Sequence, residues 1–560
     1  MLRRIALFIA LALAALCQNK RPLTADEWWR RAVIYEIYPR SFADTNGDGV
    51  GDINGITQHL DYIKRLGVDG IWLTPIYPSP QVDFGYDISD YTAIDPQYGS
   101  MGDFDHLMSE AKKRGIRVIM DLVLNHTSDK HPWFIESRSS RTNPKADWYI
   151  WRDGKPNGGP PNNWQSIFGH SAWQYDPQRR QYYYHEFYKE QPDLNWRNPE
   201  VRKAMYDVAR FWMRKGVAGF RLDAITSLFE DPEFRDEPIL HPGLNAYGEP
   251  FLTRQYTDNL PEVHTVLREL RRATDEYPGV VLIGETYVPN IEELHKMYGV
   301  KNDELQLPMD TPFGFINKLS VTEFRKKLIA AETQLGGNPP LLVLENHDNP
   351  RSLNRYGGPN PPPGLGKLLA TLLLAPRCAA LVYYGEELGM VNNDPKRKED
   401  VKDPIGRIGW PKEIGRDGER SPMQWNAGKN AGFSNGAQTW LPVAPNYDTH
   451  NVAVEDREPG SLLNYYVSLI RLRKENEALR DGDFEPVDET DTNVLAWVRK
   501  AKNGDMAVVA LNFTSAPRIV TLPFSKAATL LSSFSKTGDV VDLKSVTIPP
   551  YGAYIGEIGK

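Results

Sequence analysis

The sequence predicts an α/β protein: a (β/α)8 TIM barrel with an inserted subdomain after its third strand and an antiparallel β-domain at its C-terminal end. Three observations support this fold class. Short runs of bulky apolar residues alternate with helix-like segments along most of the 560-residue chain. An acidic residue closes several of these runs, at Asp223, Glu285 and Asp348. No glycine-rich phosphate-binding turn follows a predicted strand, which disfavours the alternative, an open doubly wound sheet that binds nucleotides.

The barrel is expected from two parts of the chain, residues 21–126 and 196–478. Its strands are predicted at residues 32–38, 70–73, 116–122, 219–223, 281–284, 342–344 and 379–384. Helices are predicted between them at residues 56–66, 104–114 and 201–215. Strands of this apolar kind are buried on both faces and form parallel sheets, and in a barrel their carboxyl ends carry the functional groups.

Irregular segments interrupt and follow this pattern. Residues 127–195 are rich in Trp, Tyr, Pro, Gly and Asn and are expected to form an insertion subdomain, because long irregular segments at strand ends are typical of functional lids. A second long loop is expected at residues 385–444. Residues 479–560 contain short strand-like runs, which predicts a small β-sandwich domain. Those runs lie at residues 494–499, 506–512, 518–522 and 553–556.

Composition narrows the classes of partner. The formal net charge is −7 and no basic stripe is present, so a nucleic-acid partner is not expected. Hydrophobic residues make up 41% and charged residues 25% of the chain, which is ordinary for a globular protein. Aromatic residues make up 11%, and flat rings suit the apolar faces of sugars. The sequence gives no signal of the oligomeric state.

Residues 1–20 are expected to be a secretory signal and not part of the fold. Arg3 and Arg4 precede an apolar run at residues 5–16, and that run is too short to span a bilayer comfortably. The sequence therefore predicts export to the periplasm or the extracellular space, without a membrane span.

The two cysteines carry different expectations. Cys17 directly follows the apolar run, so a lipid anchor at this thiol is the alternative to simple cleavage of the signal. Leu16 is larger than the residue that usually precedes a lipidated cysteine, which favours simple cleavage. Cys378 lies in an apolar run, and a chain with one remaining thiol has no disulfide framework.

The strand-end carboxylates predict the chemistry. Asp223, Glu285 and Asp348 are expected to meet at one barrel mouth. Cleavage of a glycosidic bond uses a pair of carboxyl groups on either side of the scissile bond. A single strand-end carboxylate is usually one half of an ion pair, but three at successive strand ends indicate a glycosidic site.

Several motifs add a resemblance to a known family. In order and spacing they closely resemble the four signature regions of the α-amylase family, glycoside hydrolase family 13. The motifs are Asp121-Leu-Val-Leu-Asn-His126, Gly219-Phe-Arg-Leu-Asp223, Gly284-Glu-Thr-Tyr287 and Asn346-His-Asp348. Three further segments resemble the branch that holds α-glucosidases and oligo-1,6-glucosidases: Val33–Phe42, Gln191–Trp196 and Arg420–Trp425. The resemblance runs from about Trp28 into the C-terminal β-domain.

The resemblance implies roles for the three carboxylates. Asp223 would be the nucleophile, Glu285 the general acid and then the general base, and Asp348 a third carboxylate that grips sugar hydroxyls. No cofactor takes part in such a reaction. Arg221 lies two residues before Asp223, hence on the same strand face, where its cation would keep Asp223 ionised. Glu285 is expected to have a raised pKa, through burial and neighbouring negative charge.

The resemblance also implies substrate contacts. His126 and His347 would hydrogen-bond the glucose at the cleavage site, and Tyr86 would stack on it. Asp83 would pair with an arginine of the late loop and close the pocket floor. Arg416 and Arg420 are the two candidates for that arginine.

A calcium site is predicted independently of the sugar chemistry. Oxygen ligands alternate with glycines in a pattern that resembles the first part of an EF-hand loop: Asp44, Asn46, Asp48, the carbonyl of Val50, and Asp52. The glutamate that closes an EF-hand at position 12 is replaced by Gly55. Related oligosaccharide hydrolases hold a structural Ca²⁺ in such a loop; the alternative is a polar turn without metal.

The expected substrate is a short α-1,4-linked glucoside, cleaved from its non-reducing end. In this branch a valine after the nucleophile accompanies α-1,6 cleavage, whereas this chain has Ala224. An Asp83–arginine closure would restrict the pocket to terminal glucose. The alternatives are an oligo-1,6-glucosidase and a glucosyl-transferring enzyme that converts sucrose or trehalose.

Overall fold

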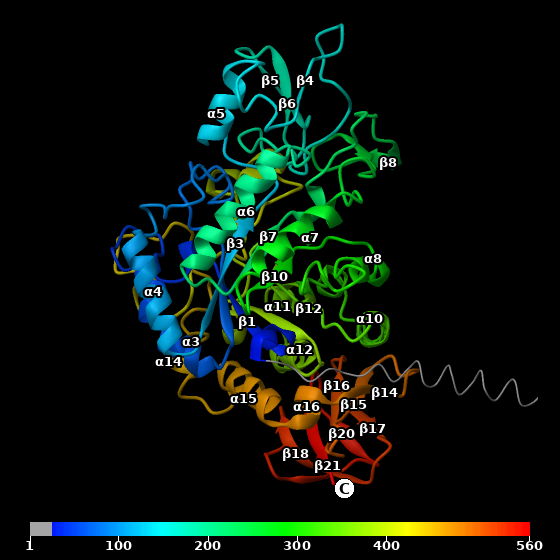
Figure 1. Ribbon diagram of the computed structural model, residues 1–560. Coiled ribbons are helices and arrows are strands. Elements are labelled where there is room, and N and C mark those ends of the chain that lie inside the picture. The colour runs from blue at the N-terminus through cyan, green and yellow to red at the C-terminus, as the bar shows by residue number, and fades with distance from the viewer. Residues whose placement is uncertain (1–24, 560) are drawn as a thin grey trace, which may run out of the picture.

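The computed structural model describes residues 25–559, and three regions are stacked along its length (Figure 1). A barrel fills the middle, a small α/β subdomain lies at one end, and the C-terminal β-domain lies at the other. The predicted signal segment, with Cys17, lies outside the described residues. Among the described helices, none has the length and apolar character needed to cross a membrane.

Eight parallel strands form the barrel, in the spatial order β11-β10-β7-β3-β2-β1-β13-β12. A parallel bridge between Met309 and Leu341 joins the two outer strands and closes the ring. The strands are β1 (Val33–Ile37), β2 (Gly70–Leu73), β3 (Arg117–Val123), β7 (Gly219–Asp223), β10 (Val281–Gly284), β11 (Leu307–Pro308), β12 (Leu341–Val343) and β13 (Ala379–Tyr383). The predicted (β/α)8 class is confirmed. The two-residue β11 has no counterpart among the apolar runs, because it is too short to produce one.

Helices follow the strands and cover the outside of the barrel (Figure 1). They are α2 (Ile53–Gln58), α3 (Leu60–Leu66), α4 (Met101–Lys113), α6 (Pro199–Arg214), α7 (Val263–Thr274), α8 (Ile291–Lys296), α9 (Thr311–Gly314), α10 (Val321–Gln334), α11 (Ser352–Gly357), α12 (Leu365–Leu374), α15 (Leu462–Glu475) and α16 (Glu477–Asp481). The helix predicted at residues 56–66 is broken at His59 into α2 and α3. Ser100 and Asp103 form a capping box that starts α4, and Asn198 caps α6.

The interior of the barrel changes from apolar to polar along its axis. A separate buried cluster, which includes Ile34, Ile119 and Ile283, fills the lower interior. Because strand side chains alternate, residues two positions further along point the same way. Those positions are Glu36, Asp121 and Glu285. The strand C-termini therefore carry charged groups above an apolar plug, which is the usual site of TIM-barrel chemistry.

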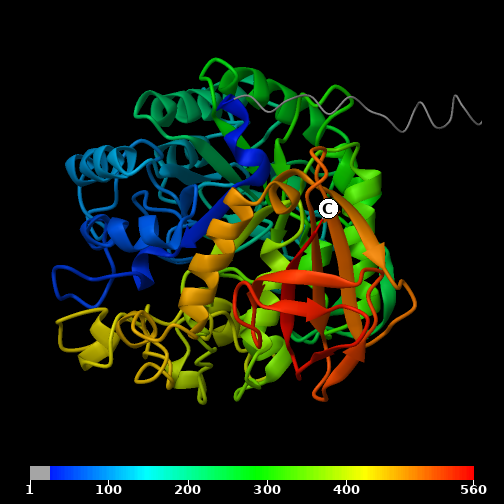
Figure 2. The same ribbon diagram turned by 90° about the horizontal axis from the view of Figure 1, so that it is seen from below.

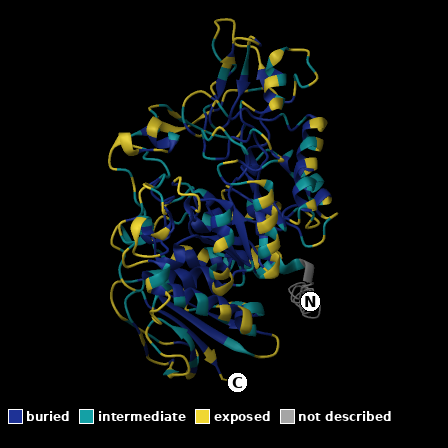
Figure 3. Cartoon of the chain, turned by 90° about the vertical axis from the view of Figure 1, so that its left-hand side faces the viewer, coloured by how far each residue is buried: buried dark blue, intermediate teal, exposed yellow. Residues whose placement is uncertain are grey.

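The insertion between β3 and α6 contains the helix α5 (Pro132–Ser139) and a three-stranded antiparallel sheet. Its strands are β4 (Trp151–Arg152), β5 (Trp173–Asp176) and β6 (Gln181–Tyr184). A hairpin between β7 and α7, made of β8 (Ile239–Leu244) and β9 (Pro250–Leu252), was not expected from the sequence. Contacts such as Asn163 N to Asp236 Oδ1, at 2.9 Å, join this segment to the insertion. Figure 3 shows yellow, exposed loops at this end and dark blue barrel strands.

The C-terminal region is built from two antiparallel sheets with an apolar core between them. Its strands are β14 (Asp483–Val487), β15 (Val494–Lys500), β16 (Met506–Asn512), β17 (Arg518–Val520), β18 (Lys526–Ser532), β19 (Val540–Asp542), β20 (Val546–Ile548) and β21 (Ala553–Ile558). Six strands form the larger sheet and β17 pairs with β20. On the other face of β15 and β16, Trp497 and Leu511 belong to the main apolar cluster of the barrel. Figure 2 shows the orange and red strands packed beneath the barrel.

Candidate active site

One buried guanidinium organises the centre of the site. Arg221 is fully buried, and its Nη1 lies 2.6 Å from Asp223 Oδ1 and 3.1 Å from Asp121 Oδ1. Its Nη2 forms an ion pair with Glu285 Oε1. Glu285 Oε2 also accepts the backbone N–H of Ala224 at 2.8 Å. The structure therefore brings Asp223 and Glu285 together at the barrel mouth, as the sequence predicted, and it adds that both contact Arg221.

The two carboxyl groups share an electrostatic environment. Burial raises the pKa of Asp223 to about 7 and that of Glu285 to about 7. Arg221 opposes both rises, and the charge of Asp348 adds to both. The raised pKa of Glu285 agrees with the prediction. The expectation that Arg221 keeps Asp223 ionised is too simple, because one cation faces three carboxyl groups. Such a set titrates as a unit, and the raised pKa values of Asp223 and Glu285 favour the binding of a proton by this pair.

Asp348 lies beside three cationic or protonated groups. Its Oδ1 contacts Arg416 Nη1 at 2.8 Å and Arg420 Nη2 at 2.9 Å, and its Oδ2 lies 3.0 Å from His347 Nε2. Burial alone would raise the pKa of Asp348, but His347 and the two arginines hold it well below its ordinary value. Asp348 is therefore ionised in the pH range in which Asp223 and Glu285 titrate.

The structure decides between the two late-loop arginines. Arg416 Nη2 contacts Asp83 Oδ1 at 2.8 Å, whereas Arg420 contacts Asp348 and donates from Nε to the carbonyl of His347 at 2.7 Å. Asp403 was missed by the sequence analysis. Asp403 Oδ2 accepts hydrogen bonds from Arg416 Nε at 2.7 Å and from the Arg416 backbone N–H at 2.7 Å. No local pattern reveals this pairing, although Asp403 before Pro404 does signal the start of α13 (Pro404–Gly409).

The two remaining predicted contacts, Tyr86 and His126, are buried at the barrel mouth. The Tyr86 ring lies close to parallel with the His347 ring, with centroids 5.5 Å apart and planes 6° from parallel, and its hydroxyl lies 2.7 Å from His347 Nε2. His126 Nε2 lies 3.2 Å from the carbonyl of Tyr86 and 3.0 Å from Gln191 Nε2. Gln191, known from the sequence only as part of a motif, also reaches Asp83 at 3.2 Å.

The predicted calcium loop is folded around Asp44. Its Oδ1 accepts the N–H of Gly47 at 2.7 Å, and its Oδ2 accepts the N–H of Gly49 at 2.8 Å and the hydroxyl of Ser434 at 2.6 Å. Asp52 caps α2 by accepting the N–H of Gly55 at 2.7 Å. Within residues 25–559, no three His, Cys, Asp or Glu side chains converge closely enough to hold a metal ion. The oxygen donors fit Ca²⁺ in kind, but the loop satisfies two of its carboxylates internally.

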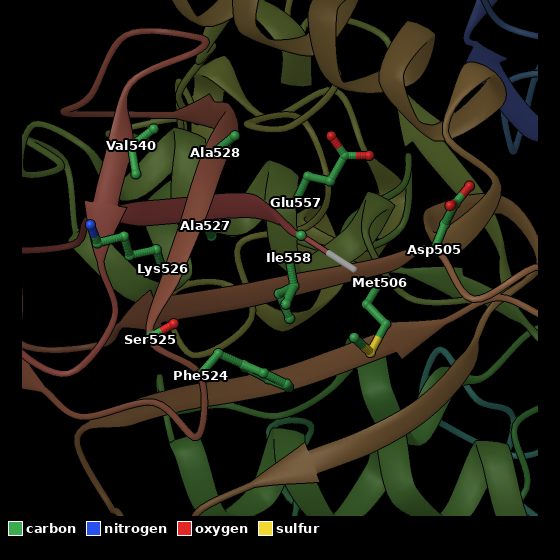
Figure 4. A pocket seen from close by; sticks show the side chains of 11 residues that line it. Asp505, Met506, Phe524, Ser525, Lys526, Ala527, Ala528, Val540, Glu557 and Ile558 are labelled. Atoms are coloured by element: carbon green, nitrogen blue, oxygen red, sulfur yellow. The ribbon is translucent and has the colours of Figure 1, made fainter.

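One cavity lies away from the carboxylate centre. A pocket of about 530 Å³ lies on the C-terminal domain, between β16, β18, β19 and β21. Figure 4 shows it bordered by Lys526 on one side and by Asp505 and Glu557 on the other. None of its lining residues belongs to the carboxylate centre at the barrel mouth.

Comparison with known proteins decides the family. The model of the α-amylase catalytic domain matches residues 36–482. The chain belongs to the α-amylase family. This family membership agrees with the resemblance drawn from the motifs, and it places the chain among glycoside hydrolases.

Similar proteins in this α-amylase family span nearly the whole chain. A probable α-glucosidase of Rhizobium meliloti (strain 1021) is 40% identical, with 95% of this chain and 97% of that protein covered. An oligo-1,6-glucosidase of Parageobacillus thermoglucosidasius is 39% identical, with 95% and 99% covered. Among solved structures, a variant of isomaltulose synthase from Erwinia rhapontici NX5, bound to sucrose, is 36% identical with a TM-score of 0.88, covering 97% of this chain and 100% of that one.

Proposed function

We propose that this α-amylase family member is a retaining, exo-acting α-glucosidase that removes terminal α-1,4-linked glucose from maltose and short malto-oligosaccharides. The observation that carries the proposal is the pairing of Asp223 and Glu285 across one buried guanidinium at the barrel mouth. Two neighbouring carboxyl groups with raised pKa suit a reaction that needs a nucleophile and an acid at once.

The reaction proceeds by two displacements. An Asp223 oxygen attacks the anomeric carbon while the bond to the leaving oxygen breaks, and Glu285 gives its proton to that oxygen. The product of this step is a β-glucosyl ester of Asp223. Glu285, now ionised, takes a proton from water, and the resulting hydroxide attacks the anomeric carbon and releases Asp223. The glucose leaves with α configuration.

Exo action is supported by the contact between Asp83 and Arg416. This ion pair, with Asp348 on the other side of the guanidinium, closes the floor of the site. A chain that passed through the floor would have to break two buried ion pairs, and breaking such pairs is costly. A terminal glucose can bind without passing through this floor, so the ion pairs stay intact.

The mechanism is tested by Asp223→Ala and by the configuration of the product. Asp223→Ala should fold normally and lose essentially all turnover of maltose, because the covalent route is removed. Proton NMR of the wild-type reaction should show α-glucose as the first product. Release of β-glucose would overturn the double displacement.

A second candidate, glucosyl transfer between sugars, is favoured by one specific observation. The similarity to isomaltulose synthase covers essentially the whole length of both chains. Transfer needs only that a sugar replace water at the glucosyl ester. Product analysis with maltose, isomaltose and sucrose separates the outcomes: free glucose from maltose supports hydrolysis, faster cleavage of isomaltose supports oligo-1,6-glucosidase action, and a rearranged disaccharide from sucrose supports transfer.

We also propose a structural Ca²⁺ in the loop at residues 44–52, held by the side chains of Asp44, Asn46, Asp48 and Asp52 and by the carbonyl of Val50. The donor set supports it, since Ca²⁺ takes oxygen ligands of this kind. The bound ion would neutralise the carboxylates of the loop. Melting curves with EGTA or added Ca²⁺ test it: added Ca²⁺ should raise the Tm, because a ligand of the folded state stabilises it by about 2.7 kcal/mol at a hundred times its Kd. Asp48→Ala should abolish that rise.

Export is proposed from residues 1–20 alone. The charged start and short apolar run support a signal that is removed from the mature protein. N-terminal sequencing of protein from the extracellular or periplasmic fraction checks this proposal, and mass spectrometry of the same material would reveal a lipid on Cys17.

A further inference from the structure

A buried glutamate lies under the candidate site and has no role in the mechanism above. Glu36 is on β1, two residues beyond Ile34, and is fully buried. Its Oε1 lies 2.6 Å from His347 Nδ1 and accepts the His347 backbone N–H at 3.3 Å. Its Oε2 has no hydrogen-bond partner. A buried carboxylate without full compensation is costly, so a compensating charge close to Glu36 is expected.

The neighbours of His347 Nε2, the ring nitrogen that does not face Glu36, show that this nitrogen is protonated. The Tyr86 hydroxyl donates to Asp121 Oδ2 at 3.0 Å, so its oxygen must accept from His347 Nε2, 2.7 Å away. Asp348 Oδ2, 3.0 Å from the same nitrogen, can only accept when ionised. Both neighbours of Nε2 are therefore acceptors, and Nε2 carries a hydrogen. If Nδ1 also donates to Glu36, the ring is an imidazolium.

Charged groups from several strands and loops surround His347. Glu36 approaches from β1 and Asp348 from the loop after β12. Asp121 on β3 acts through Tyr86, and Arg221 on β7 lies beyond the Tyr86 ring. In the late loop, Arg416 contacts Asp348, and Arg420 contacts both Asp348 and the backbone carbonyl of His347. The rings of Tyr38 and Tyr86 lie close to parallel with the imidazole, with ring centroids 5.8 and 5.5 Å from its centroid. The two charged groups that contact the ring nitrogens of His347, Glu36 and Asp348, are both negative.

We propose that Glu36 is a positioning residue that keeps His347 doubly protonated, so that the imidazolium holds Asp348 ionised and aimed at the sugar. The consequence for catalysis rests on the proposed glucosidase function; the protonation of His347 does not. Burial by itself lowers the pKa of His347, but Asp348 and Glu36 raise it to about 9, in keeping with the geometry.

The test is NMR of the His347 ring nitrogens together with the pH profile of kcat/KM. In the wild-type protein both ring nitrogens should be protonated at pH 7. In Glu36→Gln the charge is gone while the shape is kept, so the His347 titration should move down by at least 1.5 pH units. Because kcat/KM already falls as Glu285 loses its proton near pH 7, this alkaline fall should become steeper in Glu36→Gln. Glu36→Asp, which keeps the charge, should retain a doubly protonated ring at pH 7.

Glu387→Gln is the matched control. Glu387 is equally buried and accepts the Tyr35 hydroxyl from the same strand at 2.7 Å, but it makes no contact with His347. Its replacement should leave the His347 titration in place. A neutral His347 in the wild-type protein at pH 7, which can be measured without any variant, overturns the inference. So does an unchanged titration in Glu36→Gln. A shifted titration in a protein that cleaves no α-glucoside supports the inference and overturns the proposed function.

Discussion

Arg221 makes the two central carboxyl groups interdependent. A single cation touches Asp121, Asp223 and Glu285, and all three carboxyl groups are shielded from water. If all were ionised, the cluster would carry two uncompensated negative charges in a medium of low polarisability. Retaining one proton reduces that excess. In the proposed mechanism, that proton is the one that Glu285 gives to the leaving group.

The first prediction concerns Glu285→Gln and the pH dependence of stability. Burial raises the pKa of Glu285 from 4.5 to about 7. A group with a raised pKa contributes its full stability below the unfolded pKa and loses it as the pH rises through the folded one. The amide in Glu285→Gln does not ionise, so this variant does not lose that stability as the pH rises. Glu285→Gln should therefore gain roughly 1–3 kcal/mol relative to wild type between pH 5 and pH 8.

Urea unfolding of both proteins at the two pH values measures this gain. Glu399→Gln, a substitution at an exposed carboxylate of the late loop, is the control and should show no such dependence. A difference between Glu285→Gln and wild type that is the same at pH 5 and pH 8 would contradict the argument.

A second prediction concerns Ala224, the residue after the nucleophile. The sequence offered it as a determinant of linkage, and the structure adds that its φ is +44°. A β-branched side chain is disfavoured there, at a cost of order 1–3 kcal/mol. Ala224→Val should move the maltose-to-isomaltose ratio of kcat/KM part of the way toward isomaltose and should also lower the Tm.

Ala224→Gly separates the two effects, since glycine accepts this backbone conformation without strain. It should keep or raise the Tm and leave isomaltose cleavage poor. Faster cleavage of isomaltose than of maltose by the wild-type enzyme would end the linkage argument.

At the scale of elements, the late loop after β13 completes the site. It carries Arg416 and Arg420 back over the barrel mouth, where they meet Asp83 and Asp348. Asp403, on the same loop, receives two bonds from Arg416. The loop thus fixes the orientation of Arg416.

The third prediction follows from that orientation. Asp403→Asn keeps the cap of α13 but removes the charge that holds Arg416 Nε. Arg416 should then sample other positions, and the KM for maltose should rise about tenfold, because a misplaced contact of this kind costs about 1.4 kcal/mol of binding. The effect on kcat should be smaller. Asp400→Asn, an exposed site in the same loop, should match wild type; a fall in kcat at constant KM would place Asp403 in the chemical step instead.

The elements also show what the sequence could predict. Apolar runs of four or more residues located the strands that carry Asp223 and Glu285, because burial on both faces leaves a clear pattern. The two residues of β11 leave no pattern, and neither does the exposed hairpin of β8 and β9. Residues joined by loops, such as Asp403 and Arg416, are invisible to periodicity. Glu36 had a signal that was not used: a carboxylate inside an otherwise apolar strand.

At the scale of the whole molecule, the barrel and the C-terminal domain share one core. Phe513 of the C-terminal domain contacts Phe324 of α10, with ring centroids 5.9 Å apart. Both belong to the cluster that fills the space around the barrel strands. Because a shared core makes two regions unfold together, a single cooperative transition is expected.

Arg325 provides the sharpest test of that coupling. It lies on α10, is buried, and donates to the carbonyls of Glu489, Asp491 and Val494 at 2.8, 2.7 and 3.2 Å. Arg325→Gln is too short to reach all three carbonyls, and hydrogen bonds from a charged donor are among the stronger ones in proteins. The free energy of unfolding should fall by about 2–4 kcal/mol.

Arg210→Gln is the matched control for the fourth prediction. Arg210 pairs with Glu276 on the surface at 2.8 Å, where an ion pair contributes about 0–1 kcal/mol. Urea unfolding followed by Trp fluorescence measures both variants. If the barrel and the C-terminal domain are coupled through Arg325, Arg325→Gln shifts the whole transition, or separates an early step that melts only residues 483–559. Equal stability of Arg325→Gln and Arg210→Gln would mean that the shared apolar core alone holds the two regions together.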